Sequence, residues 1–485
     1  MKVSLVLLSL STAISALPAA APNSPTKLEE RQLIGGLLNG LLGGINDTIS
    51  KGDVNGLLDN LRKVQPSATP STPEQARSAL TQIIQTSKPQ NIHEYGALLS
   101  ANGLISGTLA SLINGIGGQF TGQNSASNSN PDPPSPVYPK KLPCDAPYTV
   151  SESALRSAIY IPPTFTRGQK PPVILFPGTG NTGFQTFAGN FIKLLSGQSW
   201  ADPVWVNVPK SMLDDAQINA QYAAYALNYI ASLTGRNTTM VAWSQGNLSS
   251  QWAYKYWPST RATTSDHIAI SADYAGTILA NFICPDGLAP CNPSVYQQQY
   301  LSDSNFITAL RANGGDSGYI PTTTIYSGLL DEIVQPQTGT AASSFLKDDR
   351  RVGVTNNEVQ FVCPGALAGS LYTHEGVLYN PLSLALLKDA MAHPGPGRVD
   401  RLPDLKSVCA SFLAPGLGLA DLVLTETAVV FAGLNILVGQ PRTPIEPALQ
   451  AFAKTDGATC SATTAGTAAR NVPVRGVRAG KKSGW

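Results

Sequence analysis

Charged residues are scarce in this chain of 485 residues: they make up 13% of it, and the formal net charge is only +2. Nucleic-acid binding depends on a strong basic surface, so the overall charge gives no indication of a nucleic-acid partner. Histidine is also rare, with four in the whole chain, and no Cys-x-x-Cys pair occurs. These absences argue against a structural zinc site, and the sequence implies no metal and no cofactor.

The apolar run at the N-terminus is too short to cross a bilayer, which takes about 20 apolar residues. Lys2 precedes it, residues 3–14 are nearly all apolar, and alanine and proline follow. This order is typical of a secretory signal peptide, which we assign to residues 1–20. We therefore expect a secreted, extracellular protein without a transmembrane segment. Six cysteines suit that compartment as disulfides, although six allow fifteen pairings.

Composition divides the remainder into four parts. Residues 21–120 alternate Leu and Ile with Gly, Asn and Ser, and predict a small helical pre-domain or propeptide. It either packs loosely on the main domain, or it covers an apolar site or contacts lipid. Residues 121–143 are rich in Pro, Ser and Asn and predict a linker. Residues 144–462 are the expected main domain, and residues 463–485 form a basic tail expected to be disordered.

Short apolar runs alternate with helix-like stretches in the main domain. This alternation predicts a mostly parallel central sheet with helices on both faces, and a site beyond the carboxyl ends of its strands. The predicted strands are 173–176, 204–208, 240–243, 267–272 and 322–326, and the predicted helices are 184–195 and 214–233. A later apolar stretch, Leu422 to Val438, is interpreted as a helix over the substrate pocket or as an ordinary core helix.

The segment Trp243-Ser244-Gln245-Gly246-Asn247 follows an apolar run and precedes a helix-like stretch. A strand, a sharp turn with serine at its apex and a helix form the nucleophile elbow of α/β-hydrolases. Ala242 replaces the first glycine of the usual motif, and its side chain is small enough for the turn. The alternative is an ordinary serine before a helix. Asn46, Asn237 and Asn247 lie in glycosylation sequons. Asn247 adjoins this turn, so we expect it to be unmodified.

A serine nucleophile requires a base and an acid, and α/β-hydrolases carry them in the chain order serine, acid, histidine. Two histidines follow the elbow at a suitable place, His374 in a short loop and His393 in a Pro/Gly turn, and we favour His374. Asp331 directly follows a predicted strand and is the expected acid. Glu332 is the alternative, and Asp331 would then merely cap a turn.

The oxyanion of the reaction requires backbone N–H donors near the serine. One is expected from Gln245, the residue after the nucleophile. The other is expected from the glycine-rich loop 176–183, where Thr179 is the natural donor through its N–H and its hydroxyl. This loop lacks the Lys-Ser/Thr pair of a phosphate-binding Walker motif.

These motifs resemble Candida antarctica lipase B and its secreted fungal relatives over residues 145–460. The segments that carry the resemblance are 176–180, 242–246, 272–277 and, above all, Asp331-Glu332-Ile333-Val334-Gln335-Pro336-Gln337. The resemblance implies an α/β-hydrolase fold with the triad Ser244, Asp331 and His374. It also implies an oxyanion hole of Thr179 and Gln245.

The same resemblance implies further roles. Asp273 and Gln298 would line the acyl channel, and Trp243 would floor the alcohol pocket; alternatively, Asp273 is a strand-end carboxylate without substrate contact. Cys363–Cys409 resembles a disulfide of the family. Cys284 and Cys291 lie at the family's lid-like segment and are expected to pair, which leaves Cys144 with Cys460.

We therefore expect a secreted serine ester hydrolase, a triacylglycerol lipase or carboxylesterase that forms an acyl-enzyme and is able to transesterify. Its partners would be a lipid or ester substrate and the lipid–water interface, and the protein would be a monomer. The alternatives are a cutinase-type polyester hydrolase and a catalytically silent lipid-binding relative. A further hypothesis is that the pre-domain keeps a zymogen inactive.

Overall fold

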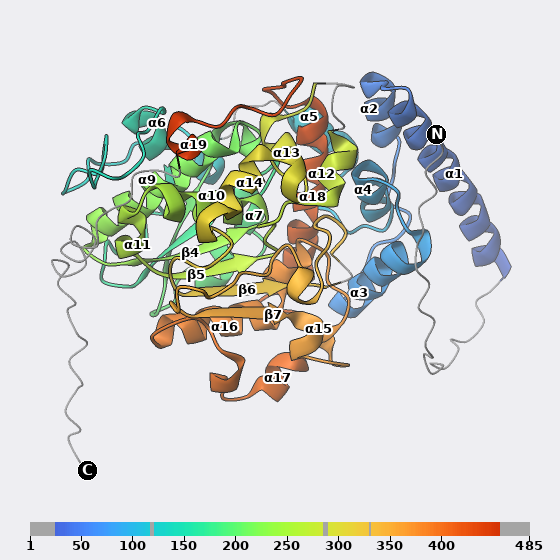
Figure 1. The fold of residues 1–485 in the computed structure, drawn as a ribbon. Helices are drawn as coiled ribbons and strands as arrows, with labels where there is room; N and C mark the ends of the chain where they lie inside the picture. Colours follow the sequence, from blue (N-terminus) through green and yellow to red (C-terminus); the bar gives the residue numbers. More distant parts are fainter. Residues whose placement is uncertain (1–24, 117–120, 285–289, 329–330, 456–485) are drawn as a thin grey trace, which may run out of the picture.

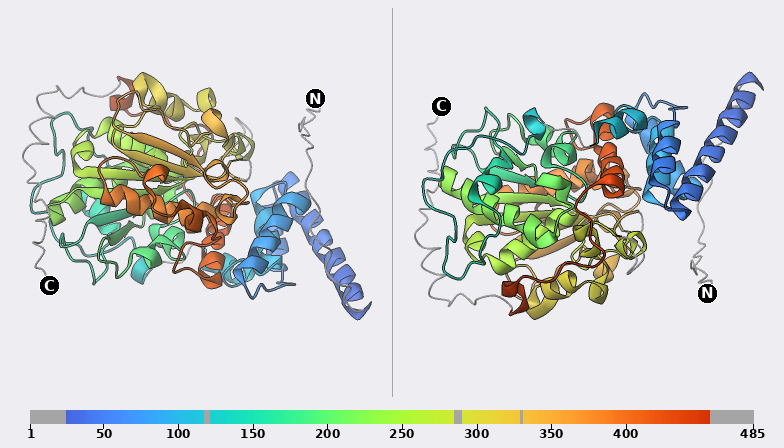
Figure 2. Two further views of the ribbon diagram at one scale, coloured as in Figure 1. Left: turned by 90° about the horizontal axis from the view of Figure 1, so that it is seen from below. Right: turned by 90° about the horizontal axis from the view of Figure 1, so that it is seen from above.

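The computed structural model describes residues 25–116, 121–284, 290–328 and 331–455, with only the backbone for residues 25–37. A central sheet lies between two layers of helices, and a group of N-terminal helices packs at one side (Figures 1 and 2). The expected signal peptide, the expected basic tail and Cys460, hence the Cys144–Cys460 pairing, lie outside the described residues.

The sheet has seven strands in the order β1-β3-β2-β4-β5-β6-β7. The short β1 pairs antiparallel with β3, and every other neighbouring pair is parallel. This confirms the predicted α/β-hydrolase fold with a mostly parallel sheet. The strands are β1 (Ile159–Tyr160), β2 (Pro172–Phe176), β3 (Asp202–Val206), β4 (Thr238–Trp243), β5 (Thr264–Ile270), β6 (Thr322–Tyr326) and β7 (Val354–Glu358).

Helices on both faces explain the composition of the strands. Every residue of β2, β3, β4 and β6 is buried, which suits their apolar or threonine-rich composition without alternation. The exception to this composition is Asp202 at the start of β3, whose carboxylate accepts the Thr166 N–H. β7 lies at the sheet edge and is only partly buried, which suits its polar sequence. Because β4, β5 and β6 are parallel, Ser244, Asp273 and Asp331 follow them at the same edge of the sheet.

Helices account for most of the remaining structure. The N-terminal helices are α1 (Pro25–Ser50), α2 (Val54–Arg62), α3 (Pro73–Gln82), α4 (Ile92–Ala101) and α5 (Leu109–Gly115), with a π-turn η1 (Ile83–Ser87). The main domain contains α6 (Glu152–Ser157), α7 (Gly183–Phe187), α8 (Phe191–Leu195), α9 (Ala216–Thr234), α10 (Gln245–Tyr256), α11 (Ser259–Thr263), α12 (Ile278–Ile283), α13 (Pro293–Tyr296), α14 (Asn305–Arg311), α15 (Val359–Val362), α16 (Pro381–Ala392), α17 (Leu405–Cys409), α18 (Leu419–Val438) and α19 (Ala451–Lys454).

Short 3-10 segments connect these elements. They are η2 (Gly122–Asn124), η3 (Pro209–Met212), η4 (Leu301–Asp303), η5 (Ala312–Gly314), η6 (Gly339–Ala341), η7 (Leu367–Gly369), η8 (Gly376–Tyr379) and η9 (Val399–Arg401). The single helix predicted over residues 184–195 is in fact two short helices, α7 and α8. Asn190 lies between them, and its side chain caps the start of α8.

The N-terminal helices share a hydrophobic core with the main domain. Buried side chains of α4, such as Leu99, belong to the same apolar cluster as Val429 of α18 and Leu175 of β2. Gly433 of α18 leaves room for Ile92, whose Cγ1 lies 3.2 Å from the place of a side chain there. Figure 2 shows these helices lying against α18. The packing is thus close, unlike that of a loosely attached segment, because α18 has apolar residues to bury on this side as well.

The segment 121–143 lies along the surface of the main domain and is bound to it by hydrogen bonds. The Gln123 carbonyl accepts from Trp205 Nε1 at 2.7 Å, and Asn130 Nδ2 donates to the Ile159 carbonyl at 2.7 Å. Asn128 Nδ2 donates to the Ser157 carbonyl at 2.8 Å. The polar composition that predicts a linker therefore also supplies side chains that bind the segment to the main domain.

Among the described residues, α18 alone is long and apolar enough to cross a membrane by length and composition, and 56% of its most apolar window is buried. It packs against α4 on one side. On another side Val429, Ala432 and Ile436 reach the cavity beside Ser244. The two interpretations of this stretch, a core helix and a helix over the pocket, therefore describe different faces of one helix.

Candidate active site

Ser244 stands at a sharp turn between β4 and α10. Its φ of 54° and ψ of −131° lie in a region that residues with a side chain rarely adopt. Two close approaches make the turn possible. A side chain at Gly178 would lie 2.8 Å from Ser244 Cβ, and one at Gly246 would lie 2.6 Å from the Pro177 carbonyl oxygen. Glycine is thus required where the loop after β2 meets the turn, and Ala242 is buried in β4.

The backbone of His374 is held from both sides. Its N–H donates to Glu332 Oε2 at 2.9 Å. Its carbonyl accepts from Ser271 Oγ at 2.9 Å and from Trp243 Nε1 at 3.2 Å. The Trp243 and His374 rings lie with their centroids 5.0 Å apart. These contacts leave the imidazole little freedom to change orientation.

Asp331 and Glu332 have different partners. Asp331 Oδ2 lies 2.9 Å from His374 Nδ1, and Oδ1 accepts the N–H groups of Ile333 and Val334. Glu332 instead contacts the histidine's backbone. The geometry therefore favours Asp331 over Glu332 as the residue that orients the imidazole.

Ser244 and His374 line one cavity. Nε2 of His374, the ring nitrogen opposite Asp331, has no hydrogen-bond partner among the described residues. It is the atom available to take a proton, because Nδ1 is engaged with the carboxylate. The remaining histidines lie elsewhere: His93 is in α4, His267 is buried in β5, and His393 contacts Asp389 at the end of α16.

Thr179 lies in the loop after β2, beside the serine. Its hydroxyl is 2.9 Å from Gln298 Oε1 and 3.0 Å from Gln245 Oε1. With one hydrogen it donates to only one of them at a time. Gln298 is itself fixed, because its Nε2 donates to the Ser294 carbonyl at 2.8 Å. Gln245 begins α10, and a first-turn N–H has no acceptor within its helix.

The cavity beside Ser244 is small, about 50 Å³, which holds only a few water molecules. Trp243, Thr179 and Gln298 line its polar side. Aliphatic residues of α12, α18 and α4 form the other side. Asp273 is not among the described residues of the cavity wall, so its expected place in the acyl channel remains a prediction.

Asp273 is wholly buried, and neither of its carboxyl oxygens has a hydrogen-bond partner among the described residues. Burial raises the pKa of this carboxyl to about 8. A proton is therefore held at neutral pH, because a charged carboxylate without partners is costly in an apolar interior.

Three more buried carboxyls, those of Glu332, Glu375 and Glu426, lie close to one another near the loop that carries His374. The sequence motifs do not single them out as a group. Burial raises the pKa of each. Glu426 accepts hydrogen bonds from Thr373 Oγ1 and Tyr379 Oη, at 3.0 and 2.7 Å. In the sequence, only Glu426 indicates such a group of buried carboxyls, because it is an acidic residue inside an apolar stretch.

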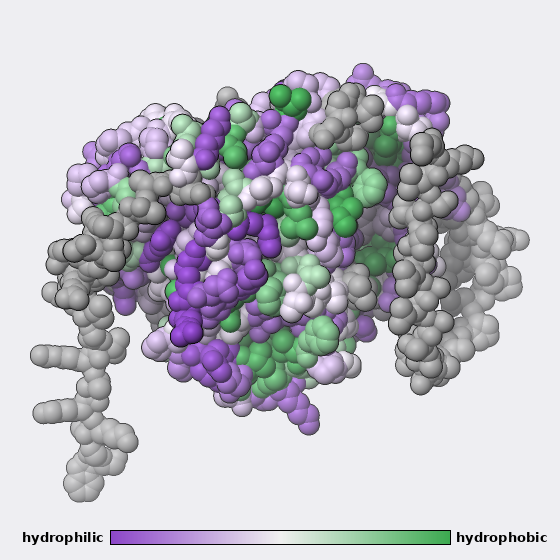
Figure 3. Space-filling view, in the orientation of Figure 1, coloured by the Kyte–Doolittle hydropathy of each residue, from purple (hydrophilic) through white to green (hydrophobic). Residues whose placement is uncertain are grey.

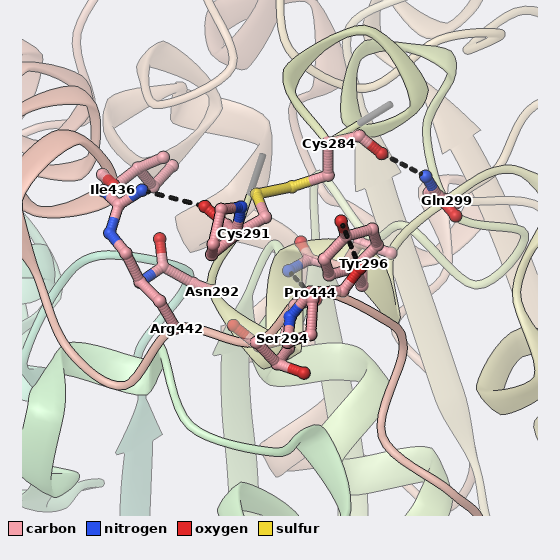
Figure 4. Close-up of a disulfide and its surroundings, with 12 residues drawn as sticks. Cys284, Cys291, Asn292, Ser294, Tyr296, Gln299, Ile436, Arg442 and Pro444 are labelled. Carbon is pink, nitrogen blue, oxygen red and sulfur yellow. Dashed lines mark hydrogen bonds between the residues drawn. A yellow bond between two sulfur atoms is a disulfide. The ribbon is translucent and has the colours of Figure 1, made fainter. Parts of the chain in front are cut away.

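The two described disulfides are Cys284–Cys291 and Cys363–Cys409, the pairs expected from the resemblance. The first joins the end of α12 to the segment before α13 (Figure 4). The sequons differ in accessibility: Asn237 is exposed and Asn46 is half-buried. Asn247 is buried, and its amide donates to the carbonyls of Ser244 and Ile270, so it offers no access to a glycan.

Comparison with known proteins connects this geometry to a family. Lipase B of Pseudozyma antarctica is 32% identical over 338 residues, which cover 65% of this chain and 89% of that protein. The crystal structure of Aspergillus fumigatus lipase B is 42% identical, with a TM-score of 0.76, over 86% of this chain and 99% of the other. No protein-family model matches.

The sheet, the strained turn and these relatives together define the class of the molecule, an α/β-hydrolase that acts as an ester hydrolase of the lipase and esterase type. Because the similarity extends over most of the length of Lipase B, the chain belongs to the Candida antarctica lipase B-like family of lipases. The resemblance seen in the sequence motifs is thereby confirmed.

Proposed function

We propose that this protein hydrolyses lipophilic carboxylic esters, acylglycerols among them, through an acyl-enzyme on Ser244. The observation that carries the proposal is the 2.9 Å contact of Asp331 with His374 Nδ1, at a histidine that shares a cavity with the strained serine.

In the first step, Ser244 Oγ attacks the ester carbonyl carbon while His374 Nε2 takes the hydroxyl proton. The negative charge on the carbonyl oxygen is stabilised by the N–H groups of Thr179 and Gln245 and by the Thr179 hydroxyl. The histidine then protonates the departing alcohol oxygen as its bond to carbon breaks, which leaves the acyl group on Ser244. Asp331 orients the imidazole and stabilises its charged form.

In the second step, water gives a proton to His374 and attacks the acyl carbon, and the same proton returns to Ser244 as the acid leaves. An alcohol in place of the water would give transesterification. The small, covered cavity supports a lipase more than a cutinase-type enzyme, because a polymer chain requires an open surface site. The presence of all three triad residues and the contact of Asp331 with His374 Nδ1 also support an enzyme over a silent lipid-binding relative.

We further propose a secreted monomer in which the N-terminal helices remain attached to the catalytic domain. Disulfides support an oxidising compartment. The shared core supports a permanent association, because removal of the helices would expose one side of α18. Equal turnover of full-length and trimmed protein on a soluble ester would exclude the zymogen hypothesis and a dependence on these helices.

The decisive experiment compares Ser244→Ala with the wild type on p-nitrophenyl butyrate and on emulsified triolein. Loss of the nucleophile should lower turnover by about 10⁶-fold. The matched control is Ser249→Ala in the same helix, since this buried hydroxyl has no described hydrogen-bond partner and should be dispensable. Retained hydrolysis in Ser244→Ala would refute the proposal. Serine-dependent activity on the butyrate alone would indicate an esterase.

A further inference from the structure

A second, larger cavity lies directly beside the one at Ser244. It has a volume of about 460 Å³ and forms a groove between the N-terminal helices and the ends of α12 and α18. Because the cavity at Ser244 is about 50 Å³, a substrate with a long alkyl chain must extend beyond it. The groove is a neighbouring space of sufficient size.

The two cavities share one wall. Its members line both spaces and are all aliphatic: Ile92, Leu279, Ile283 and Ile436. They come from α4, α12 and α18, so the wall joins the N-terminal helices to the main domain. Aliphatic side chains separate the two spaces without a polar group, and an alkyl chain can displace such contacts without breaking a hydrogen bond.

The groove itself is chemically suited to an alkyl chain. Ile49, Val54 and Leu57 of the N-terminal helices line it. The charged side chains at its edge are engaged elsewhere: Asp53 Oδ1 accepts the Gly56 N–H at 2.9 Å, and Arg442 Nη2 donates to the Ile436 carbonyl at 2.7 Å. The groove therefore presents apolar surface, and the charged side chains of Asp53 and Arg442 at its edge already have hydrogen-bond partners.

The rim of the groove is apolar and exposed. Phe282 of α12 lines the groove with 69% of its surface exposed, and the neighbouring Ile278 is 41% exposed. Apolar residues gather around α12 on this face (Figure 3). Gln299 Nε2 donates to the Cys284 carbonyl at 2.7 Å, which fastens the end of α12 beside the disulfide (Figure 4). Contiguous exposed apolar surface marks a ligand-binding groove or a site of protein or membrane contact.

We propose that the groove between the N-terminal helices and α12 binds an alkyl chain of the ester substrate whose carbonyl lies at Ser244. This inference rests on the proposed function, and the occupant follows from the position of the groove directly across the shared aliphatic wall from the cavity at Ser244. The N-terminal helices thereby become part of the substrate-binding surface and contribute to chain-length preference.

The test fills the groove without touching the proposed catalytic residues. Ile49 and Val54 are 36% and 39% exposed, so Ile49→Trp and Val54→Trp add bulk at tolerant positions. For each variant, kcat/KM is measured on p-nitrophenyl laurate and p-nitrophenyl butyrate below their aggregation limits. We expect a fall of about tenfold for the laurate, as several methylene contacts are lost, and less than about twofold for the butyrate. Phe361→Trp, at a 72% exposed position outside both cavities, is the control.

An unchanged ratio of laurate to butyrate kcat/KM in both variants would overturn the proposal, as would an equal loss on both esters. A binding measurement separates this outcome from failure of the proposed chemistry. Ser244→Ala, alone and combined with Val54→Trp, is titrated with a fluorescent lauric acid analogue. The groove predicts binding that the tryptophan weakens about tenfold, even if Ser244 proved not to be a nucleophile. Equal binding by both proteins would contradict the groove.

Discussion

The two sides of the Ser244 cavity are built by different interactions. On the sheet side, Ser244, His374 and Thr179 are positioned by directional hydrogen bonds, several of them to the backbone. On the helix side, the side chains of Ile92 of α4 and Ile436 of α18 line the cavity and pack against apolar clusters. Bond making requires atoms placed within fractions of an ångström, whereas chain binding requires only an apolar shape. The comparison suggests that the first side governs turnover and the second side governs substrate choice.

The largest effect is expected where a single hydrogen bond orients the base. Asp331→Asn keeps the shape of the side chain but favours the wrong imidazole tautomer, and should lower kcat by about 10⁴-fold, as in other serine triads. The matched control is Glu332→Gln, because an amide oxygen still accepts the His374 N–H; we expect less than about a tenfold loss. The measurement is the steady-state kcat of both variants on p-nitrophenyl butyrate. Equal losses in the two variants would mean that both carboxyls act by the same route.

A smaller loss is expected at the oxyanion donors. Thr179→Val keeps the backbone N–H and the side-chain shape but removes the hydroxyl, which lies within hydrogen-bond distance of Gln298 and Gln245. It should lower kcat by about 10²-fold with little change in KM. Thr277→Val is the comparison, because that hydroxyl also borders the cavity but donates to the Ile333 carbonyl. A larger kcat loss in Thr277→Val than in Thr179→Val would contradict the role of Thr179.

The sequence predicts the sheet side of the site much better than the helix side. Ser244, Asp331 and Thr179 each follow a strand, and a parallel sheet places the ends of such strands together, so pattern and chain order suffice to locate them. The order of preference between Asp331 and Glu332 also followed from position. The hydrogen bond of Glu332 to the His374 backbone did not, because it depends on the course of a loop that no periodicity describes.

The helix side depends on contacts between segments far apart in the chain. Ile92 and Ile436 meet at one wall, and nothing in either local sequence indicates the other. The polar segment before the main domain was likewise predicted as a linker, because its composition does not reveal that Asn128 and Asn130 find carbonyl partners on the domain. Composition indicates which residues avoid the core, but it does not indicate where they bind.

Stability should depend on pH at the buried carboxyl of Asp273. Its pKa is raised to about 8, so the folded protein keeps a proton that the unfolded chain releases near pH 4. The contribution of this group to the free energy of unfolding is therefore fully present below about pH 4, and it is lost as pH rises toward 8. Asp273→Asn removes the titration, and its Tm relative to the wild type should rise by several degrees, roughly, between pH 5 and pH 9.

The control for this prediction has the opposite sign. The Arg398 side chain lowers the pKa of the exposed Asp400, so Asp400→Asn should lose a small amount of stability that is fully present above about pH 4 and disappears only as pH falls below it. Calorimetry across this pH range measures both variants. Parallel Tm curves for Asp273→Asn and the wild type would show that the Asp273 carboxyl is solvated or paired in solution.

The smallest effect is expected on the helix side, where no single contact is decisive. Ile92→Ala shortens the half-buried wall residue of α4 between the two cavities. It should raise the ratio of laurate to butyrate kcat/KM by roughly two- to fivefold, because the removal of a few carbon atoms from an apolar pocket changes the binding free energy only slightly. The pH profile of kcat should stay unchanged, since His374 and its partners are untouched. A fall in kcat on both esters, or a shifted pH profile, would mean that the apolar side also positions the reacting groups, and the two sides of the cavity would then act as one unit.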